Sequence, residues 1–485
     1  MENKELGFSW LPEKLHEECG VFGISDADGH DCANIAYYAL YALQHRGQQS
    51  CGIAVNDSGN IVCTKDMGLV NEVFNEKILS HLKGQMAVGH VNYSKYSKAS
   101  AGYRESIQPM VRKYKKGTLT IANNGSLINA AQLRDMFESE GAVFHGTSDA
   151  EVIAHVIAKE RISSASVEEA VKKMMKIIKG AYSMIVMSPQ KMIGCRDPYG
   201  IRPLALGKLG NSYLLASETC AFDAIGAEFI RELDPGEMVV IYNNEVTSIR
   251  DNVTDNRGIC VFEYMYFARP DSIIEGTSVY EARKNAGKVL AQEHPVEADL
   301  VFGVPDSGLC AAIGYSEESG IPYGYGLIKN RYIGRTFIQP TQSERQNLVK
   351  IKLNVLADAV KGKRVVMVDD SIVRGTTIRD IVRLLKEAGA LEVHVRISSP
   401  PFKWPCYFGT DVPSKENLIA CQMELDDIAK AIEADSLGYL SIEGIKKLLP
   451  GRTGGYCQGC FTGEYPIPVP TQNEKDERRI YTHER

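Results

Sequence analysis

Strands and helices alternate in the second half of the chain, and this alternation constrains the fold more than any other feature of the sequence. Apolar runs such as RVVMVDD are typical of buried strands, and IRDIVRLLKEAG has apolar residues at helical spacing. The expected strands are 299–305, 323–328, 364–370 and 392–398, and the expected helices are 278–293, 308–320 and 378–389. This order predicts βαβ units and a mostly parallel sheet.

The first half, from residue 19 to about residue 250, has short β-type runs and a few helical segments such as 167–178. This pattern predicts stacked sheets with helices outside. The polar segment 249–258 that follows is typical of a domain boundary. A length of 485 residues favours two or three domains.

Composition excludes several classes of function. The formal net charge of -6 has both signs evenly mixed, so no basic surface for nucleic acid or membrane is expected, and an anionic substrate needs a local site. Residues 1–18 lack the apolar run of a signal peptide, and no later stretch approaches the roughly 18 apolar residues that span a bilayer. We therefore expect a soluble, cytoplasmic protein whose twelve cysteines stay reduced and can act as metal ligands or as a nucleophile.

The stretch 364–389 has the features of a phosphate site. A buried strand, 365–368, is followed by the loop 369–377 and then by an expected helix. A helix N-terminus offers backbone N–H groups to phosphate, and the two carboxylates at the strand end can bind ribose hydroxyls or magnesium. The alternative is an acidic strand end that merely caps the helix.

Two upstream segments support this site. GVPDSG (303–308) ends an expected strand, and its N–H groups suit a pyrophosphate, with Ser307 near the metal. IKNRYIGRTFIQP brings Lys329, Arg331 and Arg335 together in a chain of net negative charge, although an ordinary solvated basic loop would read the same way.

Cys19 begins the first apolar run, CGVFGI, and a lone cysteine at the start of a strand is usually a core residue. The surrounding motifs overturn that interpretation. They are EECGVFGI, ALQHRGQQSCGIAV, NNGSLIN and TSDAE in the first half, and FEYMYFARPDS, VPDSG, KNRYIGRTFIQP and VVMVDDSIVRGTT in the second.

Over essentially the whole chain, these motifs resemble the glutamine phosphoribosylpyrophosphate amidotransferase family. The resemblance implies an α+β N-terminal-nucleophile αββα sandwich followed by an α/β type I phosphoribosyltransferase domain. It also implies that 5-phosphoribosylamine is made from phosphoribosyl pyrophosphate and glutamine, the first step of de novo purine synthesis, with ammonia passed internally. The implied divisions are a propeptide at 1–18, a glutaminase domain at 19–255, a phosphoribosyltransferase domain at 256–470 and a charged tail at 471–485.

The resemblance assigns roles to single residues. Cys19 is the implied nucleophile, with its own α-amino group as the base, so residues 1–18 must be removed. Asn124 and Gly125 match the oxyanion donors, and Asp149 matches the residue that takes the α-amino group of glutamine. The residues implied for phosphoribosyl pyrophosphate are Asp369, Asp370, Ser371, Arg374, Gly375, Thr376, Thr377, Lys329 and Arg335, and those for magnesium are Ser307, Asp369 and Asp370.

Four cysteines form a candidate metal site. Cys457 and Cys460 have CxxC spacing, and Cys260 and Cys406 fall in motif-rich segments. Spacing alone favours zinc, whereas the resemblance implies the structural [4Fe-4S] cluster of one branch of the family. The cysteines without a partner pattern, expected in the core, are Cys32, Cys51, Cys63, Cys195, Cys220, Cys310 and Cys421.

The glutamine site departs from the family pattern. The family's GHVRYST, whose arginine holds the α-carboxylate of glutamine, is GHVNYSK here, with Asn92 in place of the arginine, and HNGN is NNGS, beginning at Asn123. Loss of a charge-assisted hydrogen bond weakens the binding free energy of glutamine by about 1.5–3 kcal/mol, unless Lys95 or Arg104 supplies the charge.

Three hypotheses remain. The first is a working amidotransferase with a rebuilt glutamine site, and the second is a phosphoribosyltransferase that uses ammonia or another amide donor. The third is a weakly active regulatory homologue that binds nucleotides, against which the intact Cys19, Asp369 and Asp370 argue. The resemblance further implies a homotetramer that is inhibited by purine nucleotides.

Overall fold

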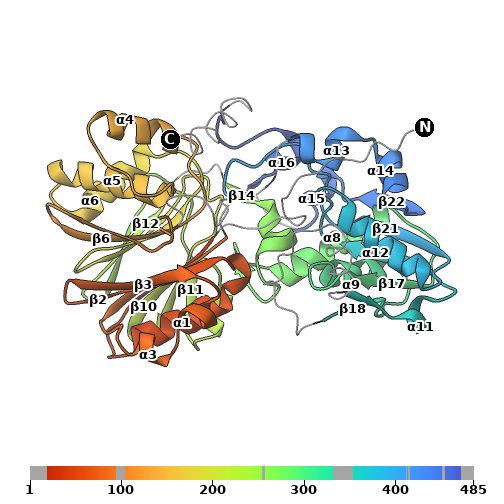
Figure 1. Ribbon diagram of the computed structural model, residues 1–485, viewed down its shortest axis with the longest axis horizontal. Coiled ribbons are helices and arrows are strands. Elements are labelled where there is room, and N and C mark those ends of the chain that lie inside the picture. Colours follow the sequence, from red (N-terminus) through yellow and green to blue (C-terminus); the bar gives the residue numbers. More distant parts are fainter. Residues whose placement is uncertain are drawn as a thin grey trace.

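The computed structural model describes residues 19–93, 104–253, 257–330, 353–410, 412, 415–449 and 454–470. The chain forms two halves that lie side by side, an antiparallel two-sheet sandwich and an α/β unit with a parallel sheet (Figure 1). The candidate residues Lys95, Arg331 and Arg335, like residues 1–18 and 471–485, lie outside the described residues.

The sandwich consists of a seven-stranded sheet, in the order β11-β9-β10-β1-β4-β2-β3, and a six-stranded sheet, in the order β13-β12-β8-β7-β6-β5. The strands of the first sheet are β1 (Cys19–Ser25), β2 (Ser50–Asp57), β3 (Asn60–Met67), β4 (Met86–Asn92), β9 (Ala205–Leu209), β10 (Ser212–Ala216) and β11 (Glu228–Glu232). Those of the second are β5 (Met110–Tyr114), β6 (Gly117–Asn124), β7 (Ser183–Met187), β8 (Met192–Arg196), β12 (Met238–Tyr242) and β13 (Glu245–Ile249).

Helices cover the outer face of each sheet (Figure 1). The first sheet is covered by α1 (Cys32–Ala42), α2 (Val70–Val73), α3 (Glu76–Leu79) and α7 (Cys220–Asp223), and the 3₁₀ turn η1 (Gln44–Arg46) follows α1. The second sheet is covered by α4 (Ala130–Ser139), α5 (Asp149–Ser163) and α6 (Val167–Ile177). The result is four layers, helices, sheet, sheet and helices.

The alternation of side chains along β1 explains this layering. Phe22 and Ile24 belong to the cluster under α1, whereas Val21 belongs to the cluster between the two sheets, with Ile185 of β7. Cys19 is two residues before Val21, so its side chain lies on the face of the first sheet that looks toward the second.

The second half is built on a parallel sheet in the order β17-β20-β21-β22. Its strands are β17 (Leu300–Gly303), β20 (Arg364–Asp369), β21 (Glu392–Ile397) and β22 (Ser436–Tyr439). The helices around it are α8 (Val279–Glu293), α9 (Leu309–Ser319), α11 (Ala357–Val360), α12 (Thr376–Glu387), α13 (Ile419–Gln422), α14 (Leu425–Ala431) and α15 (Ile442–Ile445). Val366 and Val368 pack toward α8 and α9, while Val365 and Met367 pack toward α12, so this half has three layers.

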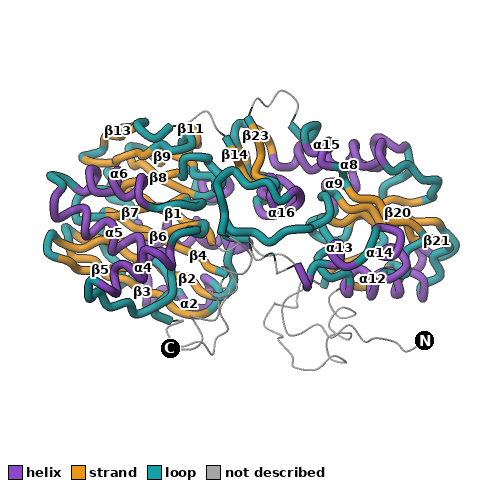
Figure 2. Tube along the Cα trace, turned by 90° about the horizontal axis from the view of Figure 1, so that it is seen from above, coloured by secondary structure: helices purple, strands orange, loops and turns teal. Residues whose placement is uncertain are grey.

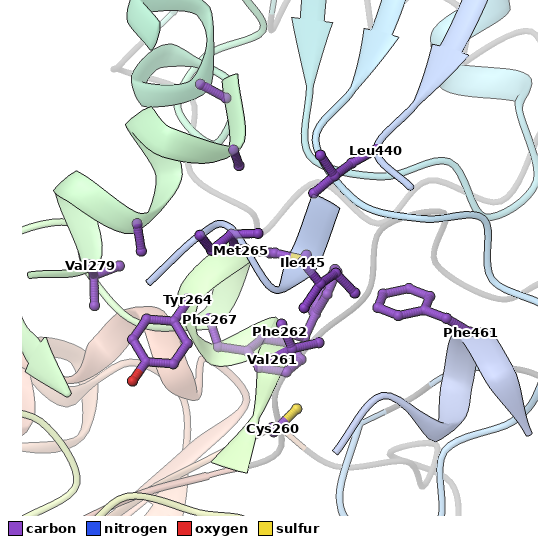
Figure 3. Close-up of a cluster of buried hydrophobic side chains, with 14 of the residues drawn as sticks. Cys260, Val261, Phe262, Tyr264, Met265, Phe267, Val279, Leu440, Ile445 and Phe461 are labelled. Carbon is purple, nitrogen blue, oxygen red and sulfur yellow. The ribbon is translucent and has the colours of Figure 1, made fainter. Parts of the chain in front are cut away.

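A third group of elements lies between the two halves (Figure 2). It includes β14 (Gly258–Cys260), β23 (Gly455–Cys457) and α16 (Gly459–Thr462), and β14 is followed by a five-residue π-helix, η2 (Glu263–Phe267). β14 and β23 pair in parallel, which places Cys260 opposite Cys457. Buried side chains of η2 and its neighbours, among them Phe262, Tyr264 and Phe267, form the cluster of Figure 3.

The fold class expected from the sequence is confirmed, and two expectations at the level of elements are wrong. In the stretch 323–328, Tyr323 makes a single parallel bridge to Val301 of β17, while Leu327 and Ile328 belong to β18 (Leu327–Lys329), which pairs antiparallel with β19 (Leu353–Val355) outside the parallel sheet. Cys421 is exposed rather than in the core: it lies in the single-turn helix α13, of which only Ile419 is buried, and its Sγ donates to the carbonyl oxygen of Lys403. Among the described helices, none is both long and apolar enough to cross a membrane.

Candidate active sites and cysteine cavity

Cys19 is anchored through both its thiol and its carbonyl group. It is the first residue of β1 and lies opposite Asn92 of β4. Its Sγ donates a hydrogen bond to Oδ1 of Asn92 at 3.3 Å, and its carbonyl oxygen accepts one from Nε of Arg46 at 3.1 Å. The predicted nucleophile is therefore a buried residue with a defined orientation at the end of a strand.

The two predicted oxyanion residues belong to the opposite sheet. β6 ends at Asn124, and Gly125 follows with φ of +120°, a conformation that favours glycine. A β carbon at Gly125 would lie 2.3 Å from the carbonyl oxygen of Ala181, so a side chain does not fit. Among the described residues, Oδ1 and Nδ2 of Asn124 are buried without a hydrogen-bond partner, as expected of an amide whose partner is a substrate.

His90 joins the two sheets at this edge. Its Nε2 donates to the carbonyl oxygen of Asn123 at 3.1 Å, and burial lowers the pKa of the imidazole to about 3, so the ring is neutral. The N–H of Asn123 donates to Oε1 of Gln108 at 2.7 Å. The end of β6 that carries Asn124 is thereby held against β4, the strand that pairs with Cys19.

Asp149 lies beside the oxyanion turn. It is the first residue of α5, and its Oδ2 accepts hydrogen bonds from the N–H of Leu127 at 2.8 Å and from Oγ of Ser126 at 3.3 Å. Arg104, the alternative to Lys95 as a source of positive charge, is exposed and forms an ion pair with Asp66 at 3.5 Å. The first predicted site thus has its nucleophile, oxyanion turn and acidic residue at one edge of the sandwich.

The predicted phosphate loop follows β20, where Asp369 and Asp370 are both buried. Oγ of Ser307 donates to Oδ1 of Asp369 at 3.3 Å and so joins the two loops that the sequence places in this site. Oγ of Ser371 donates to Oδ2 of Asp370, while Oδ1 of Asp370 is buried without a partner among the described residues. Burying an unpartnered carboxylate oxygen is costly, so this atom fits a cation or a ribose hydroxyl as its ligand.

Glycines allow these loops to approach each other. A β carbon at Gly308 would lie 2.1 Å from the carbonyl oxygen of Val368. Gly375, with φ of +82°, directly precedes Thr376, the first residue of α12, so the loop meets a helix N-terminus as predicted. Lys329 forms an ion pair with Asp306 of the GVPDSG loop, which brings its ammonium group to the same site.

Cys260, Cys406, Cys457 and Cys460 line a single cavity between the halves, together with Arg202, Phe408 and Thr410. Burial raises the pKa of Cys260 to about 12 and those of Cys457 and Cys460 well above the ordinary value, and the neighbouring thiols add to this effect. The N–H of Phe408 donates to Sγ of Cys406 at 3.3 Å. All twelve cysteines lie in the described ranges, and none forms a disulfide.

A buried ionic network that was not predicted from the sequence lies beside the first site. It consists of Arg46, Arg202, Glu218 and Glu263, and all four side chains are almost completely inaccessible to solvent. Arg46 and Glu263 fall within quoted motifs, ALQHRGQQSCGIAV and FEYMYFARPDS, but nothing in either motif connects the two residues.

Comparison with known proteins gives matches in both halves. A family model described as a glutamine amidotransferase domain matches residues 97–224, and one described as a phosphoribosyl transferase domain matches residues 275–398. The chain is 49% identical to the amidophosphoribosyltransferase of Bacillus subtilis over 461 residues, which are 94% of this chain and 95% of that protein. It is 49% identical to the amidophosphoribosyltransferase of Archaeoglobus fulgidus over 454 residues, 93% of this chain and 98% of that protein.

Two solved structures are similar over the same extent. One, described as the allosteric regulatory enzyme of purine biosynthesis, has a TM-score of 0.87 at 48% identity and covers 94% of this chain and 97% of its own. The other, the glutamine phosphoribosylpyrophosphate amidotransferase of Bacillus subtilis complexed with ADP and GMP, has a TM-score of 0.87 at 47% identity and covers 94% of this chain and 98% of its own.

Proposed function

This chain belongs to the amidophosphoribosyltransferase family, and we propose that it releases ammonia from glutamine at Cys19 and adds it to phosphoribosyl pyrophosphate at the loop 369–377. The family's reaction is the first step of purine biosynthesis, and the chain carries both the amidotransferase and the phosphoribosyltransferase unit. The observation that carries the assignment of sites is the unpartnered buried amide of Asn124, which faces the sheet of Cys19.

The chemistry at the first site begins with attack of the Cys19 thiolate on the side-chain amide of glutamine. The α-amino group of Cys19, freed by removal of residues 1–18, takes the thiol proton and passes it to the leaving nitrogen. Nδ2 of Asn124 and the N–H of Gly125 donate to the oxyanion of the tetrahedral intermediate. Ammonia leaves, and water then hydrolyses the thioester to glutamate and restores the thiol. Asp149 is positioned to accept from the α-amino group of the substrate.

At the second site, ammonia attacks C1 of the ribose, and pyrophosphate leaves from the same carbon. The N–H groups at the start of α12 and the GVPDSG loop bind the phosphate oxygens, and Lys329 and Arg335 neutralise charge on the leaving pyrophosphate. Ser307, Asp369 and Asp370 would hold a magnesium ion, which when bound neutralises charge on the pyrophosphate.

We propose a structural [4Fe-4S] cluster on Cys260, Cys406, Cys457 and Cys460. A thiolate set suits both zinc and iron–sulfur clusters. Four thiols that line one cavity support a shared metal centre, and the resemblance to the family favours the cluster over zinc. The cluster takes no part in the reaction.

Purine nucleotides are proposed as inhibitors and a homotetramer as the assembly. The similar Bacillus subtilis structure is a complex with ADP and GMP, which supports a nucleotide site in this chain as well. Native mass measurement tests the assembly, and turnover with and without these nucleotides tests the inhibition.

The proposed function is tested by pyrophosphate release from phosphoribosyl pyrophosphate and magnesium, with glutamine and with ammonia as donors. We expect turnover with both. A second candidate, a phosphoribosyltransferase that depends on ammonia, is supported by Asn92, which stands where the family pattern has an arginine. Turnover with ammonia alone would favour this candidate.

A further inference from the structure

Glu263 connects two arginines of the sandwich. It is the first residue of the π-helix η2. Short π-helical segments are rare in proteins, and those that occur often lie at functional sites. Its Oε1 accepts from Nη2 of Arg46 at 3.0 Å and from Nη1 of Arg202 at 2.9 Å, and its Oε2 accepts from Nη1 of Arg46 at 3.1 Å. Both neighbours of Glu263, Phe262 and Tyr264, are buried apolar side chains (Figure 3).

One arm of this bridge ends at the nucleophile. Nε of Arg46 donates to the carbonyl oxygen of Cys19 at 3.1 Å, while the terminal nitrogens of the same guanidinium are held by Glu263 and, at 2.5 Å, by Glu218. A guanidinium is planar, so two carboxylates that fix its fork also fix the direction of Nε. Through this hydrogen bond, the guanidinium of Arg46 orients the backbone of Cys19. The α-amino group and the thiol are oriented with it.

The other arm ends at the oxyanion turn. Nε and Nη2 of Arg202 donate to the carbonyl oxygen of Phe408 at 3.3 and 3.2 Å, and Nη2 also donates to Oγ1 of Thr410 at 3.2 Å. Between these two lies Gly409, where a β carbon would come 3.1 Å from Cα of Gly125. The segment that begins at Cys406, in the second half, thus lies directly on the oxyanion glycine of the first.

Stability alone does not explain a buried network of this kind. Replacing buried ion pairs by apolar residues is often neutral or stabilising, whereas arginine pairs fix geometry. We propose that Glu263 and Arg202 are positioning residues for glutamine hydrolysis, holding Cys19 through Arg46 and Gly125 through Gly409. This inference rests on the proposed glutaminase reaction at Cys19.

The first test is Glu263→Gln, which keeps the shape of the side chain but removes its charge. Glu218 still contacts Arg46, so the guanidinium keeps a carboxylate partner. We expect kcat for glutamine hydrolysis to fall at least about tenfold, with the KM for glutamine and the ammonia-dependent rate within about twofold of wild type. The matched control is Glu237→Gln, which removes another buried carboxylate that binds an arginine in a bidentate way, Arg231, and should leave all three values unchanged.

The second test leaves every charge in place. Gly409→Ala adds a methyl group against Gly125, and Gly320→Ala is its control, since Gly320 also has positive φ but open space around it. We expect only Gly409→Ala to lower kcat for glutamine, and to slow alkylation of Cys19 by iodoacetamide less than it slows turnover, because it disturbs the oxyanion turn rather than the thiol.

Wild-type kcat for glutamine in both Glu263→Gln and Gly409→Ala would overturn the inference, as would an equal loss of the glutamine- and ammonia-dependent rates. Failure of the proposed function looks different, since the wild-type protein itself would then show no glutamine-dependent turnover.

Discussion

Oδ1 of Asn92 accepts a hydrogen bond from the Cys19 thiol at 3.3 Å, so the residue that replaces the family's arginine contacts the proposed nucleophile itself. The two residues are direct partners in the β1–β4 ladder, which places position 92 on the same face as the thiol. A change at this position therefore acts on the glutamine site without passing through other residues.

Asn92→Arg should lower the KM for glutamine by about ten- to a hundredfold, because a charge-assisted hydrogen bond to the substrate carboxylate adds about 1.5–3 kcal/mol. Steady-state kinetics at saturating phosphoribosyl pyrophosphate gives this value. Asn92→Gln, which is longer but uncharged, is the control. A KM for glutamine that stays the same or rises in Asn92→Arg would mean that the site has been rebuilt around another donor.

Cys19→Ala should abolish glutamine-dependent turnover and leave ammonia-dependent turnover within about twofold of wild type. The reason is that the thiol acts only on the amide, while the carboxylates at Asp369 and Asp370 lie in the other half. Parallel assays with both donors check this. Loss of both activities to the same extent would contradict the division of labour between the halves.

Active protein should begin at Cys19. The α-amino group can serve as the base only if residues 1–18 are gone, and its place in the site is set by the Cys19 carbonyl and thiol bonds. Intact mass spectrometry of purified, active protein measures the terminus directly. Full glutamine-dependent activity in protein that retains Met1 would refute the expectation.

His90→Gln should make the sandwich less sensitive to acid. The imidazole pKa is lowered to about 3 in the folded protein, against 6.5 in the unfolded chain, so the unfolded state binds the proton more tightly. The folded state therefore loses stability as pH falls from 6.5 toward 3, by up to about 1.4 kcal/mol per pH unit. Thermal unfolding between pH 7 and pH 5 should show a smaller decrease in Tm for the variant. An identical decrease would exclude a buried neutral His90.

Anaerobically purified protein should contain about four iron atoms and four sulfides per chain. Cys406→Ser should lose this iron, because its side chain lines the cavity shared with Cys260, Cys457 and Cys460. Cys421→Ser, a change at an exposed cysteine that does not line the cavity, should retain it. Stoichiometric zinc in place of iron would mean that the four thiols form a zinc site instead of binding an iron–sulfur cluster.

The sequence was most informative where a site is continuous in the chain. Asp369 ends one strand, and Ser371 and Gly375 lie between that strand and the next helix, so the local pattern alone predicted a phosphate loop here. The prediction for Asn124 and Gly125 came instead from the family resemblance, through a motif that lies at the end of a strand.

What the sequence did not reveal depends on contacts between distant residues. Arg46 and Glu263 are 217 positions apart, and neither hydrophobic periodicity nor spacing connects them. Burial of charged side chains runs against the usual preference for solvent, so composition gives no sign of the network either. The contact between Gly125 and Gly409 could not be predicted either, because glycine has no side chain that would contribute to a sequence pattern.

The pairing of β14 with β23 sets an order for the folding of this protein during translation. Every strand of the sandwich comes before residue 250, so that half can fold while the rest of the chain is still being translated. Cys260, by contrast, leaves the ribosome long before its partner Cys457, and the thiol-lined cavity closes only when translation is almost finished. A nascent chain released before Gly455 would carry a folded sandwich, but it would lack the strand that pairs with β14 and two of the four cysteines that line the cavity.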